Sequence, residues 1–327
     1  MTSTAVRASA RPNIALVKYW GKREVALNLP AVPSLSITLD ALETVTTVRF
    51  DASASQDRFT LNGRANDGAA ARASAFVDLF RQLAGTAERV VIDSTNNFPT
   101  AAGLASSASG FAAMAVALDA ALGLGLDARS LSRLARQGSG SAARSIFGGF
   151  VEMHAGRRAD GEDAEAAPLA TADDWPLEVV IALTSLAPKA VGSTDGMTHT
   201  AETSPYYAAW VDTAAADLEA GRAAVAARDF AALAQVSERS CLKMHAVAMA
   251  ADPGLIYWNA STVDCLRCVR ELRADGCPVF FTIDAGPQVK AVCPPDAADR
   301  VAAALAGVAG VRSVLRTGLG GGARIEV

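Results

Sequence analysis

The sequence predicts an α+β fold of two lobes, on three observations. Runs with the period of strands and runs with the period of helices do not alternate strictly, which argues against a doubly wound parallel sheet. Near residue 185 the character of the chain changes, and long alanine-rich helical segments follow. The 327 residues, 51% of them hydrophobic, suffice for two modest domains with full cores. We therefore expect one domain at 1–185 and a second at 186–327.

Hydrophobic periodicity places the elements of the first lobe. Helical spacing is clear at 69–83 and again after residue 104, where Leu104, Phe111 and Leu118 share one face. Asp127 is expected to cap a helix that ends before Gly138. Segments rich in β-branched and aromatic residues predict strands at 45–50, 58–61, 90–93, 149–153 and 177–184, with a polar surface excursion at 157–174.

The second lobe is expected to be mainly helical. Its periodicity predicts helices at about 205–221, 228–249, 255–275 and 296–307, and strands at 277–284 and 311–317. Cys265 and Cys268 form a C-x-x-C pair within the third of these helices. Because no second pair and no nearby histidine accompanies them, we expect buried helix cysteines rather than metal ligands.

Composition and charge argue against several classes of protein. A net charge of −4 does not suit a surface built for nucleic acid. No apolar run approaches the roughly 20 residues that span a bilayer, and no signal-peptide core with a cleavage site is present. The five cysteines all lie in the last third of the chain and are odd in number, which favours a reduced, cytoplasmic setting.

The first 23 residues contain five basic side chains and no acidic one. An N-terminus of this kind can be a transit peptide. Pro12 and the turn at Gly21 interrupt any amphipathic helix there, so a positive patch that meets an anionic ligand is the favoured interpretation.

A loop rich in Gly, Ala and Ser at 99–110 follows a predicted strand and opens a predicted helix. Gly103 and its small neighbours let backbone N–H groups approach a ligand, and the new helix adds unpaired donors and the positive end of its dipole. Ser106, Ser107 and Ser109 add hydroxyl groups. These features predict a phosphate site, although a strand-to-helix turn with serine caps has the same spacing. The loop matches neither GxxxxGK[ST] nor GxGxxG.

Two further segments bring basic side chains toward such a site. Residues 14–18 alternate as on a strand, which would bring Lys18 to the site just before the Gly21 turn. The Gly/Ser-rich loop 139–144 ends in Arg144, whose guanidinium suits bidentate recognition of a carboxylate or phosphate. Taken alone, either segment would equally suit a surface turn with solvated charges.

A third segment supplies an acid. The predicted strand that begins at residue 277 stops at Asp284, beside a Gly-Pro turn, where a carboxylate can also be a simple cap. None of the three histidines, His154, His199 and His245, lies in any of these segments. A histidine-based acid–base scheme is therefore unsupported, and any base is expected to be a carboxylate.

Together these segments resemble the mevalonate diphosphate decarboxylases, members of the superfamily of galactokinase, homoserine kinase, mevalonate kinase and phosphomevalonate kinase. PTAAGLASSA at 99–108 matches the superfamily loop P-x-x-x-G-L-x-S-S-A. Strings that resemble the decarboxylases specifically are KYWGK at 18–22, LNGR at 61–64, SGSAAR at 139–144, STDGM at 193–197 and DAGP at 284–287. The resemblance runs from about residue 7 to the end, and it implies two α+β lobes with an active-site cleft between them.

The resemblance also implies roles for individual residues. Asp284 is the catalytic base, Lys18 its electrostatic partner, Arg144 the holder of the substrate carboxylate and Ser193 a polar neighbour of the reacting groups. The implied substrate site consists of Asn13, Tyr19, Trp20, Gly21, Lys22, Arg64, Ser139, Gly140, Ser141, Ala142, Ala143 and Thr194. The implied ATP site consists of Asn97, Pro99, Ala102, Gly103, Leu104, Ala105, Ser106 and Ser107.

Two positions depart from the family pattern. Gln288 stands where family members usually have Asn. Ala187 and Pro188 precede Lys189 in a stretch that often carries paired lysines, so a nucleotide contact by Lys189 is left open.

The chemistry of such a decarboxylase explains these residue types. Loss of CO2 from mevalonate diphosphate leaves electrons with no carbonyl group to accept them, and no other electron sink is visible in the sequence. Phosphorylation of the tertiary C3 hydroxyl by ATP makes it a leaving group, so the electrons of the breaking bond can flow to C3. This transfer is loose and depends on positioning and charge, with Mg2+ bridging the ATP phosphates. An aspartate of ordinary pKa, about 3.9, takes the hydroxyl proton late.

The expected reaction converts (R)-5-diphosphomevalonate and ATP to isopentenyl diphosphate, ADP, phosphate and CO2, in isoprenoid biosynthesis. We expect a cytoplasmic homodimer without nucleic-acid or membrane partners. One alternative is a 5-phosphomevalonate decarboxylase or a kinase that stops at the 3-phosphate; a monophosphate needs fewer cationic contacts, yet Lys22 and Arg64 are both present. A catalytically silent sensor is a third hypothesis, against which the presence of Asp284 and Lys18 argues.

Overall fold

A computed structural model of the chain describes residues 5–65, 67–98, 105–187 and 189–326. Its strands are β1 (Val6–Ala10), β2 (Asn13–Val17), β3 (Lys22–Glu24), β4 (Leu29–Pro30), β5 (Ser34–Thr38), β6 (Thr44–Asp51), β7 (Arg58–Leu61), β8 (Arg64–Ala65), β9 (Arg89–Asn96), β10 (Phe150–Met153), β11 (Ala166–Ala170), β12 (Glu178–Leu183), β13 (Phe280–Thr282), β14 (Val289–Cys293), β15 (Ser313–Gly318) and β16 (Arg324–Ile325). Its helices are α1 (Asp67–Ala84), α2 (Ser106–Leu122), α3 (Ala128–Gly138), α4 (Ala142–Ser145), α5 (Ser193–Thr203), α6 (Tyr207–Ala227), α7 (Phe230–Met249), α8 (Ala260–Ala274) and α9 (Ala298–Ala306).

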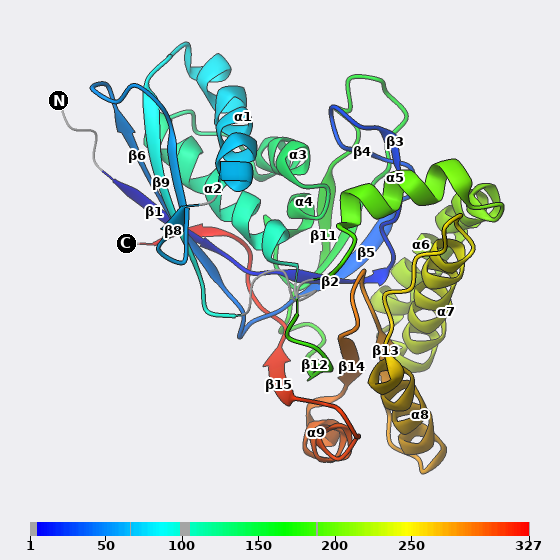
Figure 1. Cartoon of the computed structure of the whole chain (residues 1–327). Helices are drawn as coiled ribbons and strands as arrows, with labels where there is room; N and C mark the ends of the chain where they lie inside the picture. The colour runs from blue at the N-terminus through cyan, green and yellow to red at the C-terminus, as the bar shows by residue number, and fades with distance from the viewer. Residues whose placement is uncertain (1–4, 66, 99–104, 188, 327) are drawn as a thin grey trace.

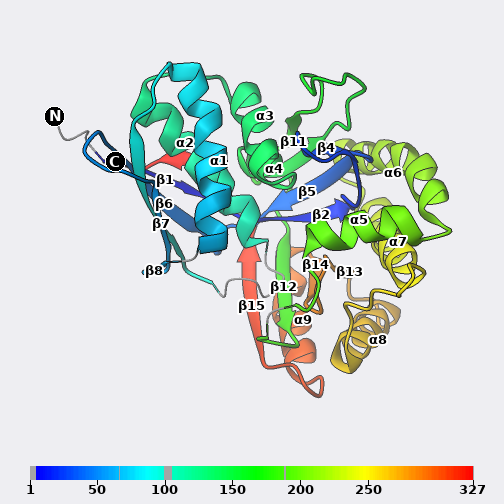
Figure 2. The ribbon, with the colours of Figure 1, turned by 45° about the horizontal axis from the view of Figure 1, so that its top comes forward.

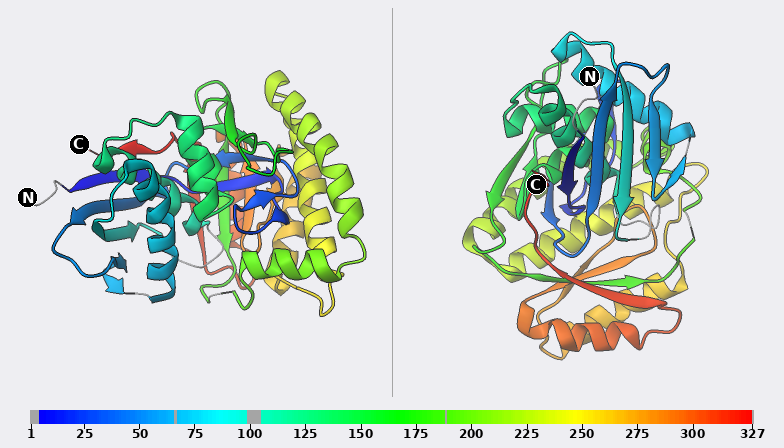
Figure 3. Two further views of the ribbon diagram at one scale, coloured as in Figure 1. Left: turned by 90° about the horizontal axis from the view of Figure 1, so that it is seen from above. Right: turned by 90° about the vertical axis from the view of Figure 1, so that its left-hand side faces the viewer.

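These elements mix helices with sheets, so the α+β class is confirmed (Figure 1). Within the described ranges the three larger sheets have the strand orders β16-β1-β6-β9-β7-β8, β11-β10-β5-β2 and β13-β14-β12-β15. Helices α1 to α4 lie together on one side of the first sheet (Figure 2). Helices α8 and α9 lie on the outer side of the third sheet, at the bottom of the right-hand view in Figure 3.

Most of the elements expected from periodicity are present. Strands β6, β7, β9, β10, β12 and β15 and helices α1, α7 and α9 lie within a few residues of the expected ranges. Asp127 is the N-cap of α3, because its Oδ1 accepts from the backbone N–H of Ser130 at 2.7 Å. Cys265 is fully buried in α8, whereas Cys268 is only partly buried.

Other expectations were wrong, each for a physical reason. The helix expected from residue 255 begins at Ala260, because Asn259 forms a capping box with Thr262 and ends the preceding extended segment. The strand expected at 277–284 is confined to Phe280–Thr282, and it stops there because the backbone N–H and C=O of Ile283 bond to side chains of α7 instead of to the sheet. The excursion at 157–174 contains the strand β11, whose Pro168 is tolerated because β11 is an edge strand. Helix α5 was not anticipated, since its sequence is too polar for clear periodicity.

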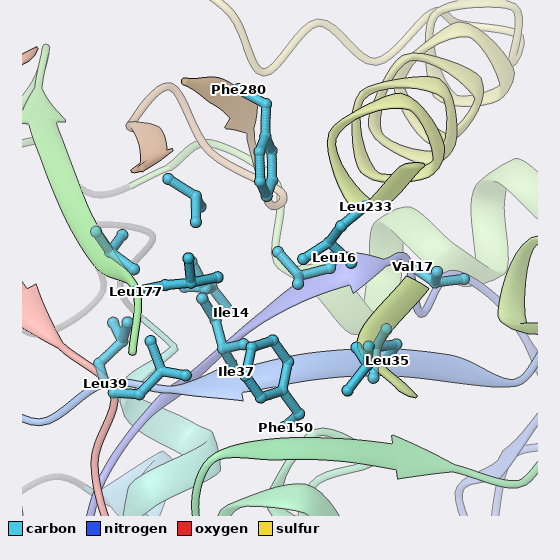
Figure 4. Packing of buried hydrophobic residues seen from close by; sticks show 14 of the residues in the cluster. Ile14, Leu16, Val17, Leu35, Ile37, Leu39, Phe150, Leu177, Leu233 and Phe280 are labelled. Atoms are coloured by element: carbon cyan, nitrogen blue, oxygen red, sulfur yellow. The ribbon is translucent and has the colours of Figure 1, made fainter. Parts of the chain in front are cut away.

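One hydrophobic cluster joins the two halves of the sequence. It combines Ile14 and Leu16 of β2 with Leu233 of α7 and Phe280 of β13. Figure 4 shows the side chains of Phe280 and Leu233 pointing toward Leu16 and Ile14 of β2. Strand β12 precedes residue 185 but pairs with β14 and β15 of the later sequence. The division into 1–185 and 186–327 stays a prediction, and the packing ties the two parts together.

None of the described helices combines the length and the apolar character that crossing a membrane requires.

We predict that Phe280→Ala lowers the free energy of unfolding by about 3–5 kcal/mol, because it removes a fully buried ring from this cluster. Ile256→Ala is the control, since Ile256 is 74% exposed, and its effect should stay within about 0.5 kcal/mol. Urea unfolding followed by circular dichroism measures both. Equal effects of the two substitutions would contradict the assignment of Phe280 to the core.

Candidate active site

A cavity of about 860 Å³ is lined by residues from both halves of the sequence. It brings together most of the residues that the sequence singled out. Those that line it are Asn13, Lys18, Tyr19, Trp20, Lys22, Ala105, Ser106, Ser107, Ser139, Gly140, Ser141, Arg144, Ser193, Thr194 and Asp284.

An ion pair between Lys18 and Asp284 lies in this cavity. Lys18 follows the last residue of β2, and Asp284 follows β13 by two residues. Lys18 Nζ lies 2.7 Å from Asp284 Oδ1, with the lysine side chain 1% exposed and the aspartate 25% exposed. The Asp284 carboxylate is therefore accessible to a ligand, whereas Lys18 is buried.

A second lysine faces the same carboxylate. Lys290 of β14 is also 1% exposed, and its Nζ lies 3.3 Å from Asp284 Oδ2. Burial on its own raises the pKa of Asp284, but the charges of Lys18 and Lys290 outweigh it and hold that pKa below its ordinary value. Lys290 was not predicted from the sequence, although a lysine within an otherwise apolar strand, Val289–Cys293, is a signal that could have identified it.

Arg144 is buried on α4 and held by side chains of two strands. Its Nη1 donates to Ser34 Oγ at 2.6 Å, and its Nε donates to Ser36 Oγ at 3.0 Å. Nε and Nη2 also donate to Asn13 Oδ1, at 3.3 and 3.2 Å. Of the five guanidinium N–H groups, two have no partner among the described residues and remain for a ligand. Burial lowers the pKa of Arg144 to about 10, so the group is still cationic at neutral pH.

Serine hydroxyls line the cavity where α2 begins. Ala105, in a left-handed conformation, is the N-cap residue of α2, and its methyl side chain forms no capping hydrogen bond. The first N–H groups of the helix and its dipole therefore suit an anion. Ser107 Oγ lies 3.3 Å from Ser139 Oγ, which in turn lies 3.3 Å from Ser141 Oγ. This row of hydroxyls connects the predicted ATP loop with the predicted substrate loop.

Close approach explains two glycines beside the cavity. A Cβ at Gly140 would lie 2.3 Å from Tyr19 Oη, and a Cβ at Gly21 would lie 2.0 Å from Tyr207 Oη. Gly21 also has a φ of +109°, which other residues rarely adopt. Burial raises the pKa of Tyr19, and its hydroxyl has no hydrogen-bond partner among the described residues. A ligand could satisfy it.

Lys22 and Arg72 supply positive charge elsewhere in the cavity. Burial lowers the pKa of Lys22, the charge of Arg72 lowers it further, and Asp195 opposes them. Arg72, on α1, donates to the carbonyl of Gly138 at 3.3 Å. Arg72 was not predicted from the sequence, because an exposed arginine on an alanine-rich helix carries no local signal.

Some expected residues lie outside the cavity lining. Arg64 is exposed on β8, at the edge of the first sheet. The side chain of Asn97 bonds instead to the backbone of Glu43 and Ala41. Gly21, Ala142 and Ala143 adjoin lining residues without lining the cavity themselves. The predicted ATP contacts Pro99, Ala102, Gly103 and Leu104 lie outside the described residues.

The structure places Gln288 and Lys189, which belong to the two departures from the family pattern. Gln288 is buried and binds the backbone of Thr184 and Ser185, which ties its loop to the end of β12. Lys189 lines the cavity and donates to Ser193 Oγ at 2.6 Å and to the carbonyl of Ala285 at 3.2 Å. Its contact with a nucleotide stays a prediction.

The donor set decides what kind of metal site is feasible. Among the described residues, no group of three or more His, Cys, Asp or Glu side chains could hold an ion alone. Mg2+ usually binds through phosphates with only one or two protein oxygens. The hydroxyls of Ser106 and Ser107, which line the cavity, fit that mode.

Comparisons with known proteins agree with this site. Residues 10–166 match the model of the diphosphomevalonate decarboxylase-like N-terminal domain, and residues 179–316 match that of the mevalonate 5-diphosphate decarboxylase C-terminal domain. A diphosphomevalonate decarboxylase of Ganoderma lucidum is 40% identical over 315 residues, covering 88% of this chain and 78% of the relative.

Solved structures of the same enzymes are also similar. The mevalonate diphosphate decarboxylase of Staphylococcus aureus has a TM-score of 0.93 at 37% identity, over 100% of this chain and 99% of that one. A structure described as MDDEF in complex with MVAPP, AMPPCP and magnesium has a TM-score of 0.91 at 40% identity, over 98% of both chains. This chain belongs to the diphosphomevalonate decarboxylase family.

Proposed function

We propose that this chain catalyses the ATP-dependent decarboxylation of (R)-5-diphosphomevalonate to isopentenyl diphosphate, with release of ADP, phosphate and CO2. The observation that carries the proposal is the pair Lys18–Asp284, 2.7 Å apart, in one cavity with Arg144 and the serines of both predicted ligand loops. The relative named above in complex with MVAPP, AMPPCP and magnesium supports the choice of substrates.

Asp284 accepts the proton of the C3 hydroxyl in this scheme. Because its pKa is held low by Lys18 and Lys290, it is too weak a base to ionise an alcohol outright. It instead orients the hydroxyl and takes the proton as the bond from oxygen to phosphorus forms. The two lysines stabilise the negative charge that gathers between hydroxyl and phosphoryl group.

Arg144 orients the group that leaves as CO2. Its two remaining N–H groups suit the two oxygens of a carboxylate, and its contacts with Asn13, Ser34 and Ser36 fix the guanidinium plane. A fixed carboxylate aligns the breaking carbon–carbon bond with the emptying orbital at C3. Ser193, held by Lys189, is a polar neighbour of these groups.

The N-terminus of α2, with Ser106 and Ser107, holds the ATP phosphates in this scheme. Mg2+ bound to those phosphates would offset their negative charge during transfer. Tyr19, Lys22, Ser139 and Ser141 hold the substrate diphosphate, and we add Arg72 to this set.

We further propose that the protein is a cytoplasmic homodimer. Each chain is divided into domains at 1–185 and 186–327, with the active-site cleft between them. The cavity lining drawn from both halves supports the cleft, and the unpaired cysteines suit a reduced compartment. Light scattering on the purified protein tests the dimer.

We predict that Asp284→Asn lowers kcat by about 10²- to 10⁴-fold, because it removes the proton acceptor while keeping the shape of the side chain. Release of ADP and of CO2 from diphosphomevalonate measures the effect. Asp40→Asn, which changes an exposed carboxylate outside the cavity, is the control and should leave kcat unchanged. A variant at Asp284 with near-normal turnover would rule out the proposed role.

We predict that Arg72→Gln raises the KM for diphosphomevalonate about tenfold, the value of one charge-assisted contact. The KM for 5-phosphomevalonate should change less, because a monophosphate needs fewer cationic partners. Arg64→Gln is the matched comparison, since the family resemblance implies a place for Arg64 in the substrate site, whereas Arg72 lines the cavity and Arg64 does not. A larger rise in KM in Arg64→Gln than in Arg72→Gln would contradict the role of Arg72 and support that of Arg64. A higher kcat/KM of the wild type on 5-phosphomevalonate than on diphosphomevalonate would support the alternative function, a 5-phosphomevalonate decarboxylase.

We predict that Lys290→Met moves the acid limb of the kcat–pH profile to higher pH. Removing one of two cations lets the pKa of Asp284 rise toward its ordinary value, so the carboxylate is protonated, and activity lost, at a less acidic pH. Stopped assays across the acidic range measure the limb. A limb that stays in place, or moves to lower pH, would contradict the role of Lys290.

A further inference from the structure

The backbone leaves its sheet one residue before Asp284. Strand β13 ends at Thr282, so the peptide groups of Ile283 lie outside the ladder. Ile283 is fully buried. Buried N–H and C=O groups need partners, and the position of the next residue, Asp284, depends on what those partners are.

Helix α7 supplies both partners. Cys241 Sγ accepts from the N–H of Ile283 at 3.2 Å, and His245 Nε2 lies 3.2 Å from the carbonyl oxygen of Ile283. The two side chains are four residues apart and so lie on one face of the helix. They replace the sheet bonds that Ile283 lacks.

The state of the His245 ring follows from its surroundings. A carbonyl oxygen can only accept, so Nε2 carries the proton and donates it. The ring is 1% exposed, and its centroid lies 4.8 Å from that of Trp258 and 6.3 Å from that of Tyr257, which fixes its orientation. Burial, followed by the charge of Lys18, lowers the pKa of His245 to about 3, so the ring is neutral at working pH.

The same helix also holds the other member of the ion pair. Ser240 Oγ accepts from the backbone N–H of Lys18 at 2.9 Å. The backbones next to both charged groups are therefore fixed to one rigid element. His245 does not line the cavity, so any effect it has on the reaction is indirect.

We infer that His245 is a positioning residue, which holds the Asp284 carboxylate against Lys18 and the reacting hydroxyl through its hydrogen bond to the Ile283 carbonyl. Without this donor the Ile283 carbonyl keeps only the weak S–H contact of Cys241 Sγ, at 3.6 Å, and the segment shifts to find a stronger partner. A displacement of about 1 Å in a reacting group can cost roughly 10²-fold in rate. The inference rests on the proposed function.

The test compares His245→Phe, which keeps a ring and removes the donor, with His245→Gln, whose amide restores an N–H near the Nε2 position. We expect His245→Phe to lower kcat about 10- to 100-fold with both KM values within about twofold, and His245→Gln to recover most of that loss. His199→Phe is the matched control: His199 also binds a backbone carbonyl, that of Pro253 at 2.8 Å, but away from Asp284. It should keep the wild-type kcat.

An unchanged kcat in His245→Phe, or equal losses in the Phe and Gln variants, would overturn the inference. A second pair of variants decides the matter if His245→Phe does not fold. Cys241→Ala removes the acceptor for the Ile283 N–H, and Cys265→Ala makes the same change at a buried cysteine on α8. We expect kcat to fall several-fold only in Cys241→Ala, and equal kcat values in the two would overturn the inference.

The assays separate this inference from the proposed function. ADP and CO2 are both measured with diphosphomevalonate as substrate. A wild-type protein that releases neither would refute the proposed function. A wild-type protein that releases both, together with a fully active His245→Phe variant, would refute only the role of His245.

Discussion

The ion pair of Lys18 and Asp284 sets the constraint on which the site depends. Its members are 266 positions apart in the sequence, yet their charged atoms lie 2.7 Å apart. A lysine that is 1% exposed is costly to bury unless a carboxylate accompanies it. Strand β2, which carries Lys18, must therefore pack against β13 and α7, and the hydrophobic cluster of Ile14, Leu16, Leu233 and Phe280 supplies that packing. The same packing of β2 against β13 and α7 therefore forms part of the core and places the ion pair of the site.

The inner part of the cavity is rich in cations. Lys18 and Arg144 are buried in its lining, Lys290 is buried against Asp284 outside the lining, and Asp284 pairs with the two lysines. Lys189 adds a further positive charge near Ser193. Among the described residues the protein leaves this charge to be balanced largely by its ligands, which carry a carboxylate and several phosphates. In the proposed scheme, one distribution of charge serves both the binding of anions and the loss of CO2, because the same cations would hold the substrates and stabilise the transferred phosphoryl group.

Much of this arrangement could be predicted from the sequence, because the signals are local. Strand β6 alternates between buried and partly buried residues, and the loops ending in Arg144 and Ser107 have distinctive strings. The remainder depends on long-range contacts. His245 lies 38 residues from Ile283 in an alanine-rich helix, where only the fold shows that it meets the active-site strand. Arg72 is one of several arginines on exposed surfaces. Strand β11 contains Pro168, which argues against a strand when only the sequence is known. Arg64 was favoured by a matching string, yet its place on β8 is outside the cavity lining.

The pairing of β16 with β1 bears on how the chain folds during synthesis. Ser9 lies opposite Arg324 and Ala8 opposite Ile325, so the six-stranded sheet is closed on one side by residues made more than three hundred positions later. At roughly 5–20 residues per second, that strand follows β1 after about 15 to 65 seconds. During this interval β1 has an open edge, which is a template for pairing with other chains. The nascent sheet therefore needs shielding, or rapid covering by α2, until its last strand arrives.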